Sequence, residues 1–240
     1  MTVIPSDIFS RAKIVLQDEG STRWPLAEMR LWFNDALREI SLVKPTAFAK
    51  PVITLMGVGS YQKIDGQYTG ILRITTNLKT VTESPRDPGL SIKTVDKDML
   101  DAQTPYWQDQ VKTRKARVVR NVAFDQNDPN AFWVYPPNDG TGVVDVIVSR
   151  VHPGVAEIVS PANPELLSNY STPITDINDV YENIIVDYIL YRSFSKDAQF
   201  AGSAARAAAY YSQFMNALNV SIANDANRNL NVKPAQENRA

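Results

Sequence analysis

The sequence predicts an α+β protein: helix pairs from the two chain ends form one bundle, a small antiparallel β-domain is inserted between them, and an extended C-terminal arm follows. Apolar residues near both termini recur every three or four positions, which is typical of helices with one buried face. The middle of the chain instead contains short β-branched and aromatic runs separated by turn residues. We therefore expect a helix pair at 1–48, a β-rich insertion at 49–160, a second helix pair at 161–222 and a flexible arm at 223–240.

The N-terminal region is expected to form two helices. In the first, Ser6 or Asp7 is the expected N-cap and Gly20 the expected end. Pro25 suits the first position of the second helix, because the N–H that proline lacks would have no partner there, and Pro45 stops this helix. The buried faces are expected to contain Ile8, Phe9, Ala12, Val15 and Leu16 in the first helix and Leu26, Met29, Phe33, Leu37 and Ile40 in the second.

The β-rich insertion is expected to contain strands at residues 52–56, 71–78, 118–124, 132–135 and 143–151. Turn signals separate these runs, including the pair Gly57 and Gly59 and the dipeptide Pro136-Pro137. A short helix is expected at 95–102. This spacing favours a small antiparallel structure.

The C-terminal helix pair is rich in tyrosine. Asp179 and Glu182 have the spacing of a capping box that opens its first helix. The apolar stripes contain Tyr181, Ile184, Ile185, Tyr188, Ile189 and Phe194 in the first helix and Ala207, Tyr210, Tyr211, Phe214, Leu218 and Ile222 in the second. We interpret the stripe tyrosines as core residues. Tyr191 and Phe200 lie off the main stripe, and with Trp107 of the insertion they are the candidate contacts between subunits.

The composition excludes several kinds of catalytic site. The chain has no cysteine and a single histidine, His152, so disulfides, thiolate metal sites and histidine-based triads are excluded. Phosphate-binding loops, dinucleotide fingerprints and the nucleophile elbow are also absent from the sequence. We expect His152 to lie on the surface at the end of a strand. The sequence therefore predicts a protein that is not an enzyme, with no catalytic residue and no cofactor.

Metal, membrane and general nucleic-acid binding are not favoured either. Asp96-Lys97-Asp98 and the run Asp125 to Asp128 are acidic, but the second run lacks the glycine and the terminal glutamate of an EF-hand, and we predict no metal site. Residues 1–20 contain no continuous apolar segment and no later run is long enough to span a membrane, so we expect a soluble protein. The net charge of −1 argues against a general nucleic-acid binder.

One basic cluster has two interpretations. It contains Lys112, Arg114, Lys115, Arg117 and Arg120. The first interpretation, which we favour, is a solvated loop and strand edge, where positive charge prevents edge-to-edge aggregation. The second is a positive collar near nucleic acid or an acidic partner.

Several segments between Ile8 and about Leu218 occur in an order that resembles a known family. They are Ala12–Asp18, Arg23–Leu26, Leu31–Ala36, Leu100-Asp101 with Pro105–Trp107, Phe132–Pro137, Tyr181–Arg192, Lys196–Ala198 and Ala209–Phe214. In order and spacing the chain resembles the head-to-tail adaptor (connector) proteins of short-tailed bacteriophages and is similar to tail tubular protein A. Residues 57–95 do not match the pattern.

The resemblance implies a structural virion protein at the head–tail junction, made in the host cytoplasm. It implies a homo-oligomeric ring, usually of twelve copies, that docks beneath the portal protein and supports the tail nozzle or tail fibre proteins. Double-stranded DNA would pass through the lumen during genome ejection without specific binding. A C-terminal arm would reach the portal, and its candidate residues are Asn224, Asn227, Arg228, Asn231 and Lys233.

Two other hypotheses stay open at this point. One is a non-catalytic β-rich binding module with helical flanks. The other is a small carboxylate-dependent virion hydrolase, against which the single histidine and the missing nucleophile motif count.

Overall fold

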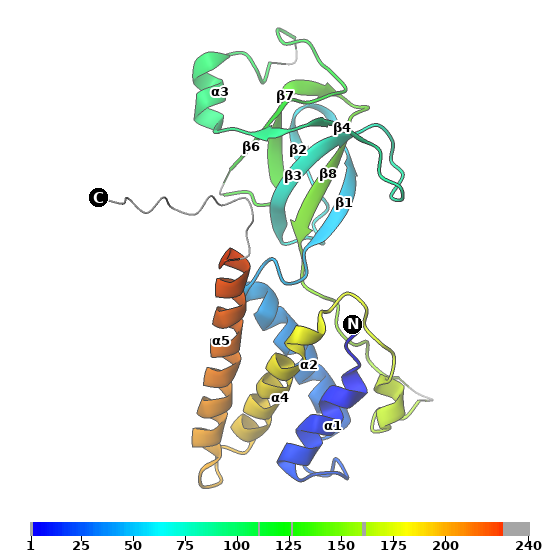
Figure 1. Ribbon diagram of the computed structural model, residues 1–240, viewed down its shortest axis with the longest axis vertical. Helices are drawn as coiled ribbons and strands as arrows, with labels where there is room; N and C mark the ends of the chain where they lie inside the picture. Colours follow the sequence, from blue (N-terminus) through cyan, green and yellow to red (C-terminus); the bar gives the residue numbers. More distant parts are fainter. Residues whose placement is uncertain (1, 110, 126, 160–161, 228–240) are drawn as a thin grey trace, which may run out of the picture. The chain divides into compact units, whose positions relative to one another are not determined.

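The chain folds into two compact units in the computed structural model, which describes residues 2–109, 111–125, 127–159 and 162–227 (Figure 1). The helical unit combines Met1–Lys44 with the chain from His152 onward, and the β unit comprises Pro45–Val151. The predicted α+β class, with helices from both ends packing together, is confirmed.

The helical unit is built around helix α4 (Glu182–Lys196), which packs against α1 (Pro5–Leu16), α2 (Leu26–Val43) and α5 (Ser203–Asn227) (Figure 1). Two short 3-10 helices, η1 (Leu167–Tyr170) and η2 (Asp179–Tyr181), lie in the segment that leads to α4. Aromatic rings fill the core: Phe9 contacts Phe33 and Tyr170 edge-on, with ring centroids 6.0 and 5.2 Å apart. Such edge-to-face pairs are a favoured geometry for buried aromatic rings.

The ends of α1 differ from the prediction. The helix begins at Pro5 with Ile4 as N-cap, because proline tolerates the first turn, and Ser6 is buried rather than capping. It ends at Leu16, where Gln17 adopts a left-handed φ of 55°, so Gly20 lies beyond the helix.

Carboxylates stabilise the start of α2. The Asp18 carboxylate accepts backbone N–H bonds from residues 22–24, each 2.9 Å long, which shapes the turn before the helix. Glu165 accepts bonds from the N–H groups of Leu26 (2.6 Å) and Ala27 (3.3 Å), so an acidic side chain distant in sequence caps α2. Pro25 is the N-cap rather than the first helical residue.

The predicted capping box at α4 is wrong. Asn178 caps the preceding 3-10 turn by accepting a 3.0 Å bond from the Val180 N–H, and α4 begins only at Glu182. The carboxylate of Glu182 instead lies 3.4 Å from the guanidinium of Arg11 on α1.

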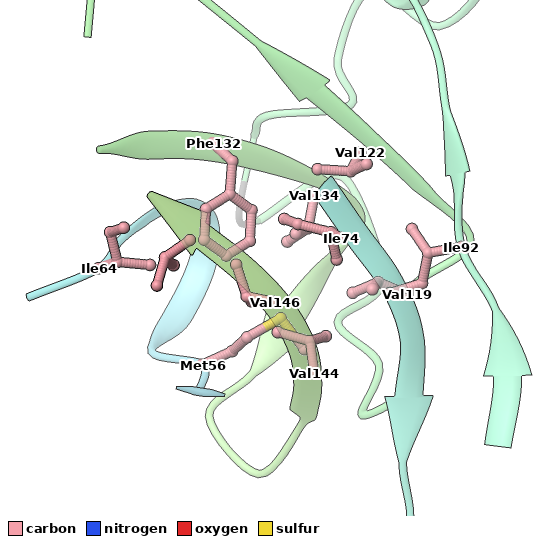
Figure 2. Close-up of a cluster of buried hydrophobic side chains, with 11 residues drawn as sticks. Met56, Ile64, Ile74, Ile92, Val119, Val122, Phe132, Val134, Val144 and Val146 are labelled. Atoms are coloured by element: carbon pink, nitrogen blue, oxygen red, sulfur yellow. The ribbon is translucent and has the colours of Figure 1, made fainter. Parts of the chain in front are cut away.

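The β unit contains two four-stranded sheets. The first has the order β1 (Lys50–Leu55), β8 (Val143–Ser149), β3 (Gly70–Leu78) and β4 (Pro88–Ser91). The second has the order β2 (Val58–Lys63), β7 (Ala131–Asp139), β6 (Asn121–Phe124) and β5 (Lys93–Thr94), and helix α3 (Lys97–Gln103) follows β5. All neighbouring strands are antiparallel except β5 and β6. Side chains from both sheets form one core, with Phe132 and Val134 of β7 near Val144 and Val146 of β8 (Figure 2).

Two predicted turns lie wholly or partly inside strands, although Gly57 does lie between β1 and β2 as predicted. Val58 and Gly59 belong to β2, where Gly59 has a φ of 112° and the register with β7 shifts between Gly59 and Tyr61. Pro136 and Pro137 lie in β7 opposite this shift. They are flanked by Tyr135, which pairs with β6, and by Asn138, which pairs with β2. Proline lacks an N–H, so it is tolerated in a strand where the ladder is interrupted.

A contact between helix α2 and the chain at residues 154–155 organises the helical unit. The Asn34 amide makes two hydrogen bonds to the backbone of Val155, accepting from its N–H (2.8 Å) and donating to its carbonyl (2.9 Å). Gly154 has a left-handed φ of 72° and lies so close to Asn34 that an added Cβ would be 2.1 Å from its Oδ1. Both the conformation and the space at residue 154 therefore require glycine.

Candidate interaction surfaces

The C-terminal helix pair buries some of its tyrosines and exposes others. Tyr181 and Tyr188 are buried, as expected for core residues. Burial raises the pKa of Tyr188 to about 12, partly offset by Arg192. On α5 only Ala207, Phe214 and Leu218 are buried, so Tyr210 and Tyr211 are not core residues as predicted. Tyr210 is half-buried with its ring stacked on Phe194, and Tyr211 is exposed.

Tyr191 and Tyr211 form an aromatic surface across α4 and α5. Their ring centroids are 4.9 Å apart, and Tyr191 also contacts the buried ring of Tyr188 at 5.5 Å. Tyr211 is 36% exposed and its hydroxyl lies 3.4 Å from the Glu39 carboxylate. Burial and this carboxylate raise the pKa of Tyr211. Two partly exposed tyrosines held in place by ring contacts are well suited to a protein interface.

The other two candidate interface residues have different positions. Phe200 is 51% exposed and lies under the Arg23 guanidinium at 4.4 Å from its ring centroid. Trp107 is fully buried: it packs with Leu100, and its indole N–H donates a 2.6 Å bond to Asp101. Trp107 is therefore a core residue of the β unit, and its side chain is not a subunit contact.

The expected C-terminal arm begins inside a helix. Helix α5 continues to Asn227, so Asn224 and Asn227 are exposed helical residues, while Arg228, Asn231 and Lys233 lie outside the described residues. The last turns of α5 are anchored by the buried Lys44, whose ammonium lies 2.7 Å from both the Asp225 carboxylate and the Ser221 hydroxyl. Burial alone would lower the pKa of Lys44, but its bonds to Asp225 and Tyr181 raise it. Sequence periodicity missed this anchor because both partners are polar.

The charged side chains of the basic cluster, which we call the basic segment (residues 112–120), lie in several different environments. Arg114 and Arg120 line one hollow together with Tyr135. Arg117 instead donates a 2.6 Å bond to the Lys79 carbonyl, and the Lys112 ammonium lies 3.8 Å from the centroid of the Tyr106 ring.

The two acidic runs come together in the β unit. Asp96, Asp98 and Asp101 of the α3 region line one hollow of about 360 Å³ with Asp125, and we call this the acidic hollow. Each run is visible in the sequence, but only the pairing of β5 with β6 brings them together. Within the described ranges, no group of three or more acidic or histidine side chains is arranged to hold a metal ion.

The expectation that His152 lies on the surface is wrong. Its side chain is buried, and its Nδ1 accepts a 2.9 Å hydrogen bond from the Gly154 N–H. Its Nε2 lies 3.7 Å from the Asp176 carboxylate. The histidine thus belongs to the contact that fixes residues 152–155 to the helical unit.

The surfaces described above are features of a structural protein that functions through contacts with other macromolecules. In the part of the chain that the structure describes, no helix could span a membrane. Comparison with protein families then gives the identity: the family model described as SU10 adaptor protein matches residues 1–235, and the chain belongs to this family. It is a phage head–tail adaptor protein, a structural component of the virion, and this membership implies a non-catalytic role. None of the curated proteins compared with the chain matches it.

Proposed function

We propose that this adaptor assembles as a closed ring between the portal and the tail, with twelve copies as the expected number, and that the ring continues the DNA ejection channel. The observation that carries the proposal is the match of nearly the whole chain to a family of phage adaptors. A subunit that presents different surfaces to its two neighbours forms a closed ring when the rotation between copies permits closure. The tail nozzle or tail fibre proteins are the expected partners on the other side of the ring.

The aromatic surface is the proposed subunit contact in the helical unit. Tyr191 and Tyr211 combine apolar area with hydroxyl groups, which suits an interface with a polar rim. Phe200, half exposed beside Arg23, is the second proposed contact.

The net charge of the chain fits a channel that DNA traverses without specific binding. Each phosphate contact made by a lysine or arginine strengthens DNA binding, so a strongly basic lumen would retain the genome. A chain with a net charge of −1 makes no large basic excess available for such contacts.

The ring is tested by measuring the mass of the purified protein alone and after mixing with portal rings. We expect the protein to add to the portal as a defined multiple of the 26.8 kDa subunit. The double variant Tyr191→Ala/Tyr211→Ala should reduce this assembly. Tyr210→Ala is the matched control, because Tyr210 neighbours Tyr211 on α5 but stacks on Phe194 within the subunit at 5.7 Å. A protein that remains monomeric alone and does not bind portal would refute the proposal.

The arm is proposed to contact the portal through residues beyond α5. Deleting 228–240 should leave the fold intact and weaken portal binding. Deleting 224–240 also removes Asp225, so we expect an additional loss of about 1–3 kcal/mol of stability because buried Lys44 loses its carboxylate. Unchanged portal binding by the shorter deletion, measured by co-sedimentation, would contradict the arm proposal.

A further inference from the structure

The β unit has two oppositely charged surfaces whose charges are not neutralised within the subunit. The basic segment contains Arg114, Lys115 and Arg120, and none of these side chains forms an ion pair among the described residues. The acidic hollow contains four carboxylates, and within the same ranges none of them is paired with a cation. Other carboxylates do have cationic partners, such as Asp225 with Lys44 and Asp145 with Arg86.

Three of the four carboxylates of the acidic hollow are held in position by neutral donors. Asp96 accepts from the N–H of Asp98 (3.0 Å), Asp101 accepts from the Trp107 indole (2.6 Å), and Asp125 accepts from the Asn127 N–H (2.9 Å). Lys97 also lines the hollow, and its ammonium lies over the Trp133 ring, 4.2 Å from the ring centroid. With four carboxylates and one lysine in its lining, the hollow retains net negative charge.

Strand β6 separates the two surfaces. Arg120 precedes the strand directly and Asp125 follows it directly, with Asn121–Phe124 between them. At about 3.3 Å per residue, the two positions lie on the order of 16 Å apart along the strand. This exceeds the reach of an ion pair, so Arg120 and Asp125 of one copy cannot neutralise each other, whereas those of two copies can.

We infer that the basic segment of one copy binds the acidic hollow of the next copy, in a head-to-tail contact between β units. The inference rests on the proposed assembly of this adaptor and specifies one surface that carries it. The charges favour this occupant because the chain itself presents the complementary surface, and because positive and negative patches placed at opposite ends of one strand orient successive copies in the same direction. Repetition of such a contact closes into a ring.

Other occupants explain less of the structure. A metal ion would fit only the acidic hollow, and its carboxylates are not arranged as a metal site. DNA could contact only the basic segment and would be repelled by the acidic hollow. A second copy accounts for both surfaces.

The test reverses the charge of one surface at a time. Asp98→Lys changes the acidic hollow at an exposed carboxylate whose side chain makes no hydrogen bond or ion pair among the described residues. The double variant Arg114→Glu/Arg120→Glu changes the basic segment. Arg73→Glu on β3 is the control, because Arg73 is also exposed and has no ion pair within the described residues. Self-association is measured by analytical ultracentrifugation at low and high salt, and circular dichroism verifies that each variant is folded.

We expect the wild type and Arg73→Glu to self-associate at low salt and each reversal to weaken this association by about tenfold or more, since several exposed charge pairs become repulsive. Salt should weaken the wild-type association, because exposed pairs are screened. Mixing the two reversal variants should restore association, since the unaltered basic segment of one variant meets the unaltered acidic hollow of the other and the two reversed surfaces also carry opposite charges.

Several results would overturn the inference. They are self-association of either reversal variant as strong as that of the wild type, failure of the mixture to associate, or a wild type that is monomeric at every concentration and at low salt. A change confined to binding of a double-stranded DNA fragment would assign the basic segment to DNA instead. If both reversal variants still assemble on portal rings as the wild type does, the inference fails while the proposed function stands.

Discussion

The contact between Gly154 and Asn34 allows a prediction with an internal control. Gly154→Ala introduces a side chain where φ is 72° and where the new Cβ would lie 2.1 Å from Asn34 Oδ1. Gly202 has a similar φ of 82°, but nothing lies within 4 Å of a Cβ built there. Gly202→Ala therefore reports the backbone penalty alone, and Gly154→Ala adds the displacement of Asn34.

The expected loss of stability follows from these two contributions. A left-handed conformation costs an alanine about 1–2 kcal/mol relative to glycine. The alanine also stabilises the protein by about 0.4–1 kcal/mol by restricting the unfolded chain, and this gain is the same at both sites. Displacing Asn34 breaks its two hydrogen bonds to Val155, at about 1 kcal/mol each. Gly154→Ala should therefore lower the free energy of unfolding by about 2 kcal/mol more than Gly202→Ala.

Urea unfolding followed by far-ultraviolet circular dichroism measures this difference, because four of the five α-helices among the described residues lie in the helical unit. A double-mutant cycle adds a second criterion. In an Asn34→Ala background the obstruction is absent, so Gly154→Ala should cost no more than Gly202→Ala. Equal losses at the two glycines in the wild-type background, or a Gly154→Ala loss that Asn34→Ala does not change, would refute the assigned role of this contact.

Two carboxylates give predictions of opposite sign. Burial would raise the pKa of Asp18, but the N–H groups of residues 22–24 more than offset this and hold the pKa below its ordinary value of 3.8. Asp18→Ala should therefore lower the free energy of unfolding by about 1–2 kcal/mol at pH 7. Urea titrations in acid should show this difference shrinking as the pH falls below 3.8. Burial raises the pKa of Asp187 despite the opposing charge of Arg11, so the folded state disfavours its charged form above pH 3.8. Asp187→Asn should therefore stabilise the protein at pH 7, and this gain should disappear in acid. An Asp187→Asn variant that is less stable than the wild type at pH 7 would contradict the assignment.

Periodicity was sufficient to predict the helices and the longest strands. The apolar spacing of α2 and α4 and the β-branched run of β8 each reflect one buried face, which a single sequence records directly. The ends of these elements were harder to predict. The cap of α2 depends on Glu165, a residue far away in the sequence, and the turn before α4 is capped by Asn178 rather than by Asp179.

The residues that the sequence misassigns are placed by contacts that the pattern of their own segment does not record. Pro136 and Gly59 are turn residues by composition, yet both lie in strands because the β2–β7 register shifts where they meet. Trp107 and His152 are buried although the pattern of their own segments does not indicate it, and hydrogen bonds with Asp101 and Gly154 satisfy the indole and the imidazole. The acidic hollow likewise depends on the pairing of two strands distant from each other in the chain.

The β unit is inserted between the two parts of the helical unit, and this order of elements affects how the chain folds. The helical unit needs both ends of the chain, and closing a loop of about 100 residues between Lys44 and His152 carries a substantial entropy cost. Strand β1 pairs antiparallel with β8, with Lys50 opposite Val148, so the folded β unit brings its own two ends to neighbouring strands. Once this pairing forms, the helices of the two chain ends are joined by a short effective connection, and much less entropy is lost when they pack. We therefore expect the core around Val146 to form before the helical unit is complete, and substitutions there to slow the assembly of both units.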